Sequence, residues 1–249
     1  MNRATCLVSG LLLASLLAVV PCATAADAPP GFVSLFNGKD FAGWKVPEGD
    51  GGHWKIVDGV IDYDAESAAK EKDLWSEKEY GDFVLRLEWR IKETPYTNPN
   101  VPIIRFDGTH KKGPDGKEIK LAVPDSDSGV FLRGFSKAQV NIWCWPTGSG
   151  EVYGYRMDDT MPAAVRAGVT PKANADKDVG QWNAFEITMK GDRLTVVLNG
   201  ITVLESAQLP AVPATGRIAL QHHGEKKGGV WAGPPSLVQF RNILVKELK

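Results

Sequence analysis

The sequence predicts an all-β protein, a sandwich of two antiparallel sheets (a jelly roll) with long loops over one sheet. Many short segments alternate apolar and polar residues, which is the period of a strand. Turn signals containing glycine separate these segments, and no sustained helical period interrupts them. Residues 26–249 are numerous enough to bury a sizeable core, and we expect them to form a single domain.

Residues 1–25 are predicted to be a signal peptide. Arg3 supplies a positive charge, residues 7–20 an apolar run, and residues 23–25 a small-residue cleavage site. Cys22 raises the alternative of a lipoprotein, but the residues before it, Val19, Val20 and Pro21, are not typical of a lipidation site. We therefore expect an exported protein, periplasmic or extracellular.

Composition narrows the classes of partner. The net charge is −1 and no long basic run exists, which argues against nucleic acid or an anionic membrane surface as partner. After residue 25 no segment is apolar enough to span a bilayer. Cys144 is then the only cysteine, so no internal disulfide can form and burial alone must stabilise the fold.

The N-terminal strands follow from alternation and turns. Residues 31–36 alternate and end at an Asn37-Gly38 turn, and residues 53–63 alternate around a hairpin turn at Asp58-Gly59. Residues 83–91 give the clearest strand of this half, with apolar side chains at the odd positions and Arg86, Glu88 and Arg90 among the even ones.

Two segments break the strand rhythm and are predicted to be surface excursions. Residues 92–124 are rich in turn signals, with a short strand expected at 102–106. Residues 157–179 form the second, with one helical turn expected at 162–166. A short strand is expected at 151–155.

Between the excursions, residues 125–134 and 139–145 are predicted to be neighbouring strands. Each has an apolar face and an opposite face that carries polar groups: Asp127 and Arg133 in the first, Gln139, Asn141 and Trp143 in the second. An acid, a guanidinium, amides and an indole are groups that can bind the hydroxyls of a sugar and stack on its ring.

The C-terminal third is the most regular part of the chain. Strands are predicted at 182–190, 193–198, 201–204, 216–223 and 237–247. Asn199-Gly200 between two of them is the strongest short hairpin signal.

Ordered motifs along nearly all of this domain carry a family resemblance. In the first part of the domain they are Ser34-Leu35-Phe36-Asn37-Gly38-Lys39-Asp40 with Gly43-Trp44, Asp82-Phe83-Val84-Leu85 with Glu88-Trp89-Arg90, and Asp127-Ser128-Gly129-Val130-Phe131-Leu132-Arg133-Gly134. In the C-terminal third they are Gly180-Gln181-Trp182-Asn183, Asn199-Gly200, Ala219-Leu220-Gln221-His222-His223-Gly224 and Phe240-Arg241-Asn242-Ile243. With these motifs the chain resembles the 3-keto-disaccharide hydrolase family, formerly a domain of unknown function.

The resemblance implies a concanavalin-A-like lectin and glucanase fold, in which two curved sheets carry the ligand on the concave face. It also implies exported bacterial enzymes that cleave glycosides whose glucose ring is oxidised at carbon 3. The ketone acidifies the hydrogen on carbon 2, so a base can remove that proton and the group on carbon 1 can leave by elimination; adding water back gives net hydrolysis. Such a site needs a general base, a cation or metal beside the enolate, and an acid for the leaving oxygen.

Strand alternation selects the side chains that we expect on the concave face. The predicted catalytic residues are Glu88, Asp127, Arg133 and His223, and the predicted substrate-binding residues are Arg90, Gln139, Asn141, Trp143, Tyr153 and Gln221. In this interpretation Glu88, Asp127 or His223 transfers protons and Arg133 stabilises negative charge. Glu88 and Arg90 also fit a solvated strand face, and Asp127 a turn cap. His222, of the opposite parity, is expected to be structural.

One departure from the family leaves alternatives open. Many members carry a Glu-Val-Gln pattern where this chain has Gln139-Val140-Asn141, and an amide cannot take a proton at ordinary pH. Either Glu88, Asp127 or Glu151 replaces the acid, or the protein is a non-catalytic carbohydrate-binding module. A structural or adhesive envelope protein is a third alternative that only the fold class motivates.

A divalent metal is a further alternative. Asp125, Asp127, Glu88 and His223 offer suitable ligands, although no compact ligand spacing supports a site. No other cofactor is predicted, and the expected partner is a carbohydrate substrate.

Overall fold

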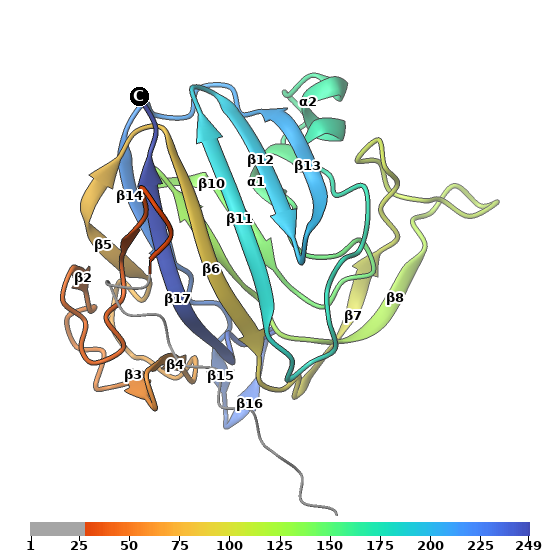
Figure 1. Cartoon of the computed structure of the whole chain (residues 1–249). Coiled ribbons are helices and arrows are strands. Elements are labelled where there is room, and N and C mark those ends of the chain that lie inside the picture. Colours follow the sequence, from red (N-terminus) through yellow and green to blue (C-terminus); the bar gives the residue numbers. More distant parts are fainter. Residues whose placement is uncertain (1–27) are drawn as a thin grey trace, which may run out of the picture.

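Two antiparallel sheets packed face to face form the body of the protein (Figure 1). The computed structural model describes residues 28–249, so the signal peptide expected at residues 1–25 lies outside the described residues. The predicted all-β sandwich is confirmed.

The larger sheet, at the front of Figure 1, has eight strands in the order β13-β12-β11-β6-β17-β4-β3, with β1 paired to β17. Its strands are β1 (Val33–Ser34), β3 (Trp54–Val57), β4 (Val60–Tyr63), β6 (Phe83–Ile91), β11 (Asn183–Lys190), β12 (Arg193–Leu198), β13 (Ile201–Gln208) and β17 (Val238–Glu247). The Asp58-Gly59 and Asn199-Gly200 turns join β3 to β4 and β12 to β13, as their sequences predict.

The smaller sheet, behind, has five strands in the order β10-β9-β14-β5-β2. Its strands are β2 (Trp44–Lys45), β5 (Leu74–Tyr80), β9 (Ser128–Leu132), β10 (Phe135–Ile142) and β14 (Gly216–Leu220). The predicted neighbouring strands are therefore β9 and β10, paired antiparallel with Val140 opposite Val130.

The core lies between the two sheets and follows the alternation of the sequence. The odd residues of β6, from Phe83 to Trp89, are at most 1% exposed. Across from them the core-facing residues of β9 and β10, such as Val130 and Val140, are fully buried. Each large apolar side chain buried in this way stabilises the fold by about 1.5–3 kcal/mol.

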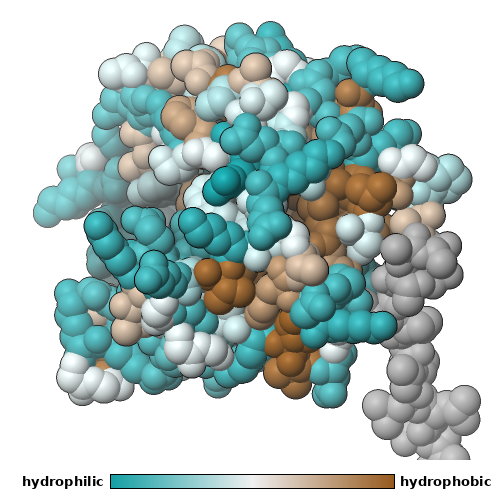
Figure 2. Space-filling view, turned by 90° about the vertical axis from the view of Figure 1, so that its left-hand side faces the viewer, coloured by the Kyte–Doolittle hydropathy of each residue, from teal (hydrophilic) through white to brown (hydrophobic). Residues whose placement is uncertain are grey.

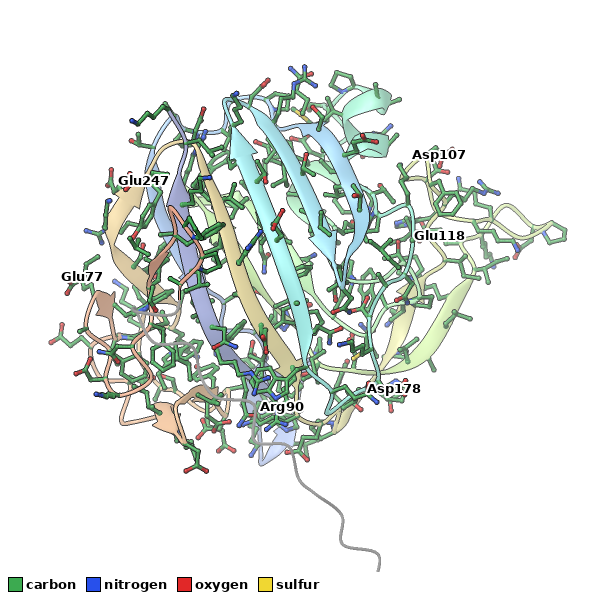
Figure 3. All side chains as sticks on the ribbon, viewed as in Figure 1. Glu77, Arg90, Asp107, Glu118, Asp178 and Glu247 are labelled. Carbon is green, nitrogen blue, oxygen red and sulfur yellow. The ribbon has the colours of Figure 1, made fainter. Side chains whose placement is uncertain are left out.

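The first excursion forms a hairpin of its own, β7 (Tyr96–Pro102) and β8 (Lys120–Asp125), whose far end extends to the right in Figure 1. Asp107 and Glu118 are labelled on this extension in Figure 3. Glu118 accepts a hydrogen bond from Nδ1 of His110, and Nε2 of His110 accepts one from Arg156, at 2.9 and 2.8 Å. These contacts hold the extension against the body of the protein.

Two short helices and a two-stranded ribbon complete the fold. They are α1 (Tyr153–Arg156), α2 (Ala163–Gly168), and the pair β15 (Lys226–Lys227) and β16 (Val230–Trp231). Helix α2 matches the helical turn expected at 162–166. Among residues 28–249, no helix is long and apolar enough to cross a membrane.

The strand expected at 151–155 is wrong, because α1 begins there instead. One helical turn brings Arg156 back to Glu151, and the two form a fully buried ion pair. Gly154 packs so closely on β10 that a Cβ there would lie 2.7 Å from the carbonyl oxygen of Lys137. Tertiary packing thus overrides the alternation of this short segment.

Candidate active site

A cleft of about 300 Å³ opens on the outer face of the five-stranded sheet. Seven predicted site residues line it: Asp127, Gln139, Asn141, Trp143, Tyr153, Gln221 and His223. The other lining residues are Asn98, Trp145 and Pro234. Side chains that are adjacent on this face come from strands far apart in the sequence.

Strand register explains why these side chains meet. Asn141 is opposite Gly129 in β9, and Gln139 is opposite Phe131. The backbone N–H of Gln221 donates to the carbonyl oxygen of Gly129 at 2.9 Å, which continues the same row into the segment after β14. Because directly opposed residues of antiparallel strands point to the same face, the amides converge.

Two amides form the floor of the cleft. Nε2 of Gln139 donates to Oε1 of Gln221. The Gln139 side chain crosses directly over Gly129, where an added Cβ would overlap it, so a glycine is required there. Gln221 keeps its own amide N–H groups for a ligand, since its carbonyl oxygen is the atom that accepts from Gln139.

Asp127 provides a desolvated carboxyl group in this cleft. Burial raises its pKa to about 7, the neighbouring Asp125 adds to the rise, and the charge of His223 opposes it. Within the described part of the chain, the Asp127 carboxylate has no hydrogen-bond partner, and neither has the Asn141 side chain. A carboxyl group that titrates near neutral pH beside a histidine suits proton transfer.

One short segment, residues 234–236, positions both Asp127 and His223. Nδ1 of His223 donates to the carbonyl oxygen of Pro234 at 2.7 Å, which leaves Nε2 as the acceptor nitrogen of the neutral ring. The N–H of Ser236 donates to the carbonyl oxygen of His223 at 3.0 Å, and its hydroxyl donates to that of Asp127 at 2.7 Å. Acid and histidine are therefore fixed to one scaffold.

Gly224 allows that close approach. Its φ is +82°, in the left-handed region, and a Cβ there would lie 2.8 Å from Cα of Pro235. Any larger residue would push the His223 backbone away from the segment that holds it.

An aromatic wall closes one side of the cleft. The rings of Trp143 and Trp145 stack with centroids 4.1 Å apart, and Tyr153 meets Trp143 edge-on. Trp143 is only 3% exposed and its indole N–H donates to Gly148, so its ring faces are largely covered. The residues free to stack on a sugar are Tyr153, 41% exposed, and the half-buried Trp145.

The four expected metal ligands do not come together. Glu88 lies on the other sheet, and the carboxylate of Asp125 is occupied by Asn98 and Trp145 on one oxygen and the N–H of Cys144 on the other. Within residues 28–249, no group of three or more His, Cys, Asp or Glu side chains is arranged to hold a metal ion.

Glu88 and Arg90 do not share the face of Asp127, so this part of the predicted grouping is wrong. Both point outward from β6 on the eight-stranded sheet, where Arg90 is labelled at the front in Figure 3. Glu88 pairs with Arg241 at 2.7 Å and accepts from Asn242, and Arg90 donates to Gln239. Alternation places residues on one face of their own strand, and says nothing about which sheet that strand joins.

Arg133 is also placed away from the cleft. It follows β9 with φ of +52°, which breaks the alternation and turns the side chain inward. Its guanidinium is buried and donates to the carbonyl oxygens of Gly81, Gly191 and Pro213, and it pairs with Asp82 at 2.7 Å. The expected charge-stabilising role beside a substrate does not fit this position.

His222 lies where its parity predicts, on the core side. Its Nδ1 lies 2.7 Å from the hydroxyl of Tyr63, and burial lowers its pKa to about 4. It is a hydrogen-bonded structural histidine.

Sequence reasoning missed Asn98 and Pro234 as residues of the cleft. Asn98 reaches it because the β7–β8 hairpin folds back over the sheet, where its side chain donates to Asp125 at 3.1 Å. Pro234 comes from the loop before β17. No local pattern signals either position, since each depends on how a loop returns to the sheet.

Comparisons with known proteins agree with this architecture. Residues 31–246 match the model of the 3-keto-alpha-glucoside-1,2-lyase-like domain. The chain is similar in structure to two proposed glycosyl hydrolases of Parabacteroides distasonis ATCC 8503. One is 22% identical, with a TM-score of 0.57, over 89% of this chain and 85% of that one. The other is 19% identical, with a TM-score of 0.53, over 88% and 94%. No curated protein sequence matches the chain.

Proposed function

The chain belongs to the family of 3-keto-alpha-glucoside-1,2-lyase-like domains, and on that premise we propose that it is an exported enzyme that cleaves 3-keto-glycosides. The observation that carries the proposal is the grouping in one cleft of the half-buried Asp127 carboxyl group and His223, with amides and aromatic rings around them. The bond that breaks would join carbon 1 of a sugar ring, oxidised to a ketone at carbon 3, to the oxygen of the leaving group.

The reaction begins with proton removal from carbon 2 of the oxidised ring. Nε2 of the neutral His223 ring takes that proton, and the electron pair of the C–H bond moves toward the ketone oxygen as an enolate. Asp127, whose raised pKa keeps it protonated near neutral pH, is then the partner that supplies a proton. The enolate then re-forms the ketone as the bond from carbon 1 to the leaving oxygen breaks, and the partner residue donates a proton to that oxygen. Water adds to carbon 1 of the resulting enone, and a proton returns to carbon 2, which completes net hydrolysis.

The amides take the place that Arg133 was expected to fill. N–H groups of Asn141 and Gln221 can donate to the ketone oxygen as it gains charge, and such prearranged donors stabilise an oxyanion. Asn141 is 4% exposed, so water competes little for its side chain. Tyr153 and Trp145 supply the surfaces for the sugar ring.

The test is to incubate the purified protein with a 3-keto-disaccharide and with its unoxidised parent, and to measure released monosaccharide. We expect release from the keto compound alone, because only the ketone acidifies carbon 2. Release from neither compound, across neutral pH and with or without divalent metal, would overturn the proposal.

Gln139 and Asn141 favour one other function, a carbohydrate-binding module without turnover. Calorimetric titration separates the two: the module binds the keto-disaccharide and returns it intact. Turnover that depends on Asp127 would remove this alternative.

Export is tested separately. We expect the protein in the periplasmic or extracellular fraction of the producing cell, with its N-terminus near Ala26 by mass spectrometry. An unprocessed chain that begins at Met1 would contradict this expectation.

A further inference from the structure

A second cavity lies on the same face of the five-stranded sheet as the cleft. It has a volume of about 500 Å³ and lies over β5 and β2. Trp75 and Arg217 line it, together with Asp73. Figure 2, which faces the left-hand side of Figure 1, shows a mostly hydrophilic surface interrupted by apolar patches.

Strand register connects this cavity to the cleft. Gln139 in the cleft floor is opposite Phe131, Phe131 is opposite Ala219, and Ala219 is opposite Trp75. The four residues form one row across β10, β9, β14 and β5. A ligand that follows the row passes from the cleft to the second cavity without leaving the sheet face.

Trp75 ends the row, and its ring packs against the buried ring of Phe131. Their rings are nearly parallel, at 12°, with centroids 5.8 Å apart. Ala219, between the two strands, is small enough to let both rings lie over it. Trp75 is half-buried, and a flat indole of this kind is suited to the C–H face of a sugar ring.

The charged groups around Trp75 balance. Three basic residues and three acidic ones line the cavity: Lys45, Lys70, Arg217, Glu48, Glu71 and Asp73. Positive and negative charges in equal number, which supply both donors and acceptors around an aromatic ring, suit a neutral polyhydroxylated ligand better than an anion or a cation. Asp73 is held in place at the edge of the second cavity, because its carboxylate accepts a hydrogen bond from the backbone N–H of His222 at 2.8 Å.

We propose that the Trp75 cavity binds the departing sugar of a 3-keto-disaccharide, while the oxidised ring occupies the cleft beside Asp127 and His223. The assignment rests on the proposed function, because the ring whose carbon 2 loses a proton must lie next to those two residues. The second ring then extends along the sheet face to Trp75.

The test compares two substrates in the variant Trp75→Ala: a 3-keto-disaccharide and a methyl 3-keto-glucoside, which has no second ring. For the disaccharide we expect kcat/KM to fall by about 10-fold, since stacking on a remote ring supplies binding energy to the transition state. For the methyl glycoside we expect a change of less than about twofold, because it never reaches Trp75. Trp75→Phe should lie between wild type and Trp75→Ala.

Trp182→Ala is the matched control. Trp182 is a half-buried indole on the outer face of the other sheet, between Arg90 and Arg241. Its removal should leave both substrates unaffected.

Equal loss for both substrates, or no loss for either, would overturn the subsite. If the wild type turns over neither substrate, the proposed function fails, and tryptophan fluorescence with the unoxidised disaccharide then decides the subsite alone. Quenching that disappears in Trp75→Phe supports it, and a titration identical to wild type overturns it.

Discussion

The outer faces of the two sheets carry similar types of polar residue, but these residues are paired on one sheet and partly unpaired on the other. On the eight-stranded sheet the polar groups are paired: Glu88 forms an ion pair with Arg241, Arg86 forms one with Glu186, and Arg90 donates a hydrogen bond to the amide oxygen of Gln239. On the five-stranded sheet, Asp127 and Asn141 lie in a cleft without side-chain partners among the described residues. The two faces share residue types, so what distinguishes the face with the candidate site is that some of its polar side chains are left without partners in the described part of the chain.

Trp182 makes the same contrast with Trp75. The guanidinium groups of Arg90 and Arg241 lie 4.7 and 4.0 Å from the Trp182 ring, so cations already contact its faces. Trp75 lies against Phe131 and beside a cavity. The ring of Trp182 is therefore already in contact with two cations, whereas the ring of Trp75 borders a cavity that a ligand can enter.

The strongest way to break the comparison is to neutralise Asp127. In Asp127→Asn the carboxamide keeps the shape but cannot exchange a proton, so we expect turnover of a 3-keto-disaccharide to fall by about 10²–10⁴-fold. Rates measured beside Glu88→Gln give the matched control from the paired face. Equal rates in Asp127→Asn and wild type would show that the cleft is not the reactive face.

Arg133 shows that belonging to the cleft strand is not enough. Arg133→Met removes a buried cation, leaves three carbonyl groups without its N–H donors and removes the ion pair of Asp82, which keeps only the hydrogen bond from the N–H of Gly191. We expect a loss of about 3–5 kcal/mol in the free energy of unfolding, measured by urea denaturation, with kcat/KM per folded molecule unchanged. A loss of turnover in a protein of wild-type stability would instead restore Arg133 to the site.

The raised pKa of Asp127 also predicts how stability depends on pH. Its pKa is about 7 in the folded protein and near the ordinary 3.8 when unfolded, so between these values the folded state binds more protons. This group therefore stabilises the fold at low pH, and that contribution decreases as pH rises from about 4 to 7. Melting temperatures of wild type should decline over this range relative to Asp127→Asn, and parallel curves would contradict the pKa assignment.

The smallest effect is expected on the paired face. Glu88→Gln breaks a partly exposed ion pair with Arg241, for which we expect a loss of about 0.2–1 kcal/mol in the free energy of unfolding. Turnover should not change. A tenfold fall in kcat without a change in stability would mean that this face takes part in the reaction.

The architecture could be predicted because it depends on local signals. Alternation identified β6 from Phe83 to Ile91, and the Asn199-Gly200 turn identified the hairpin of β12 and β13. Apolar side chains that alternate with polar ones lie on one face of a strand, and that face must pack against the core. These strands therefore follow directly from the sequence pattern. Glu151 and Arg156 show the limit, since their buried pairing favours a helical turn where the residues alternate.

The site could be predicted only in part. Whether a residue is at an odd or an even position of its strand decides which face of the sheet it lies on, but not which of the two sheets contains that strand. This odd-even pattern gathered Asp127, Gln139, Asn141, Gln221 and His223 around one cleft, on β10, just before β9 and just after β14, three neighbouring segments of one sheet. It grouped Glu88 with them, although β6 belongs to the other sheet. Strand order across a sheet is set by long-range packing, and no short window of sequence contains it.

Arg133 has a consequence for a chain that carries one cysteine beyond residue 25. Its guanidinium fastens Gly81, Gly191 and Pro213, which are separated by up to 132 positions (213 − 81), to the end of β9. Thiol and disulfide reagents do not act on these hydrogen bonds, because no sulfur atom takes part in them. The protein should keep its shape equally well in reducing and oxidising surroundings.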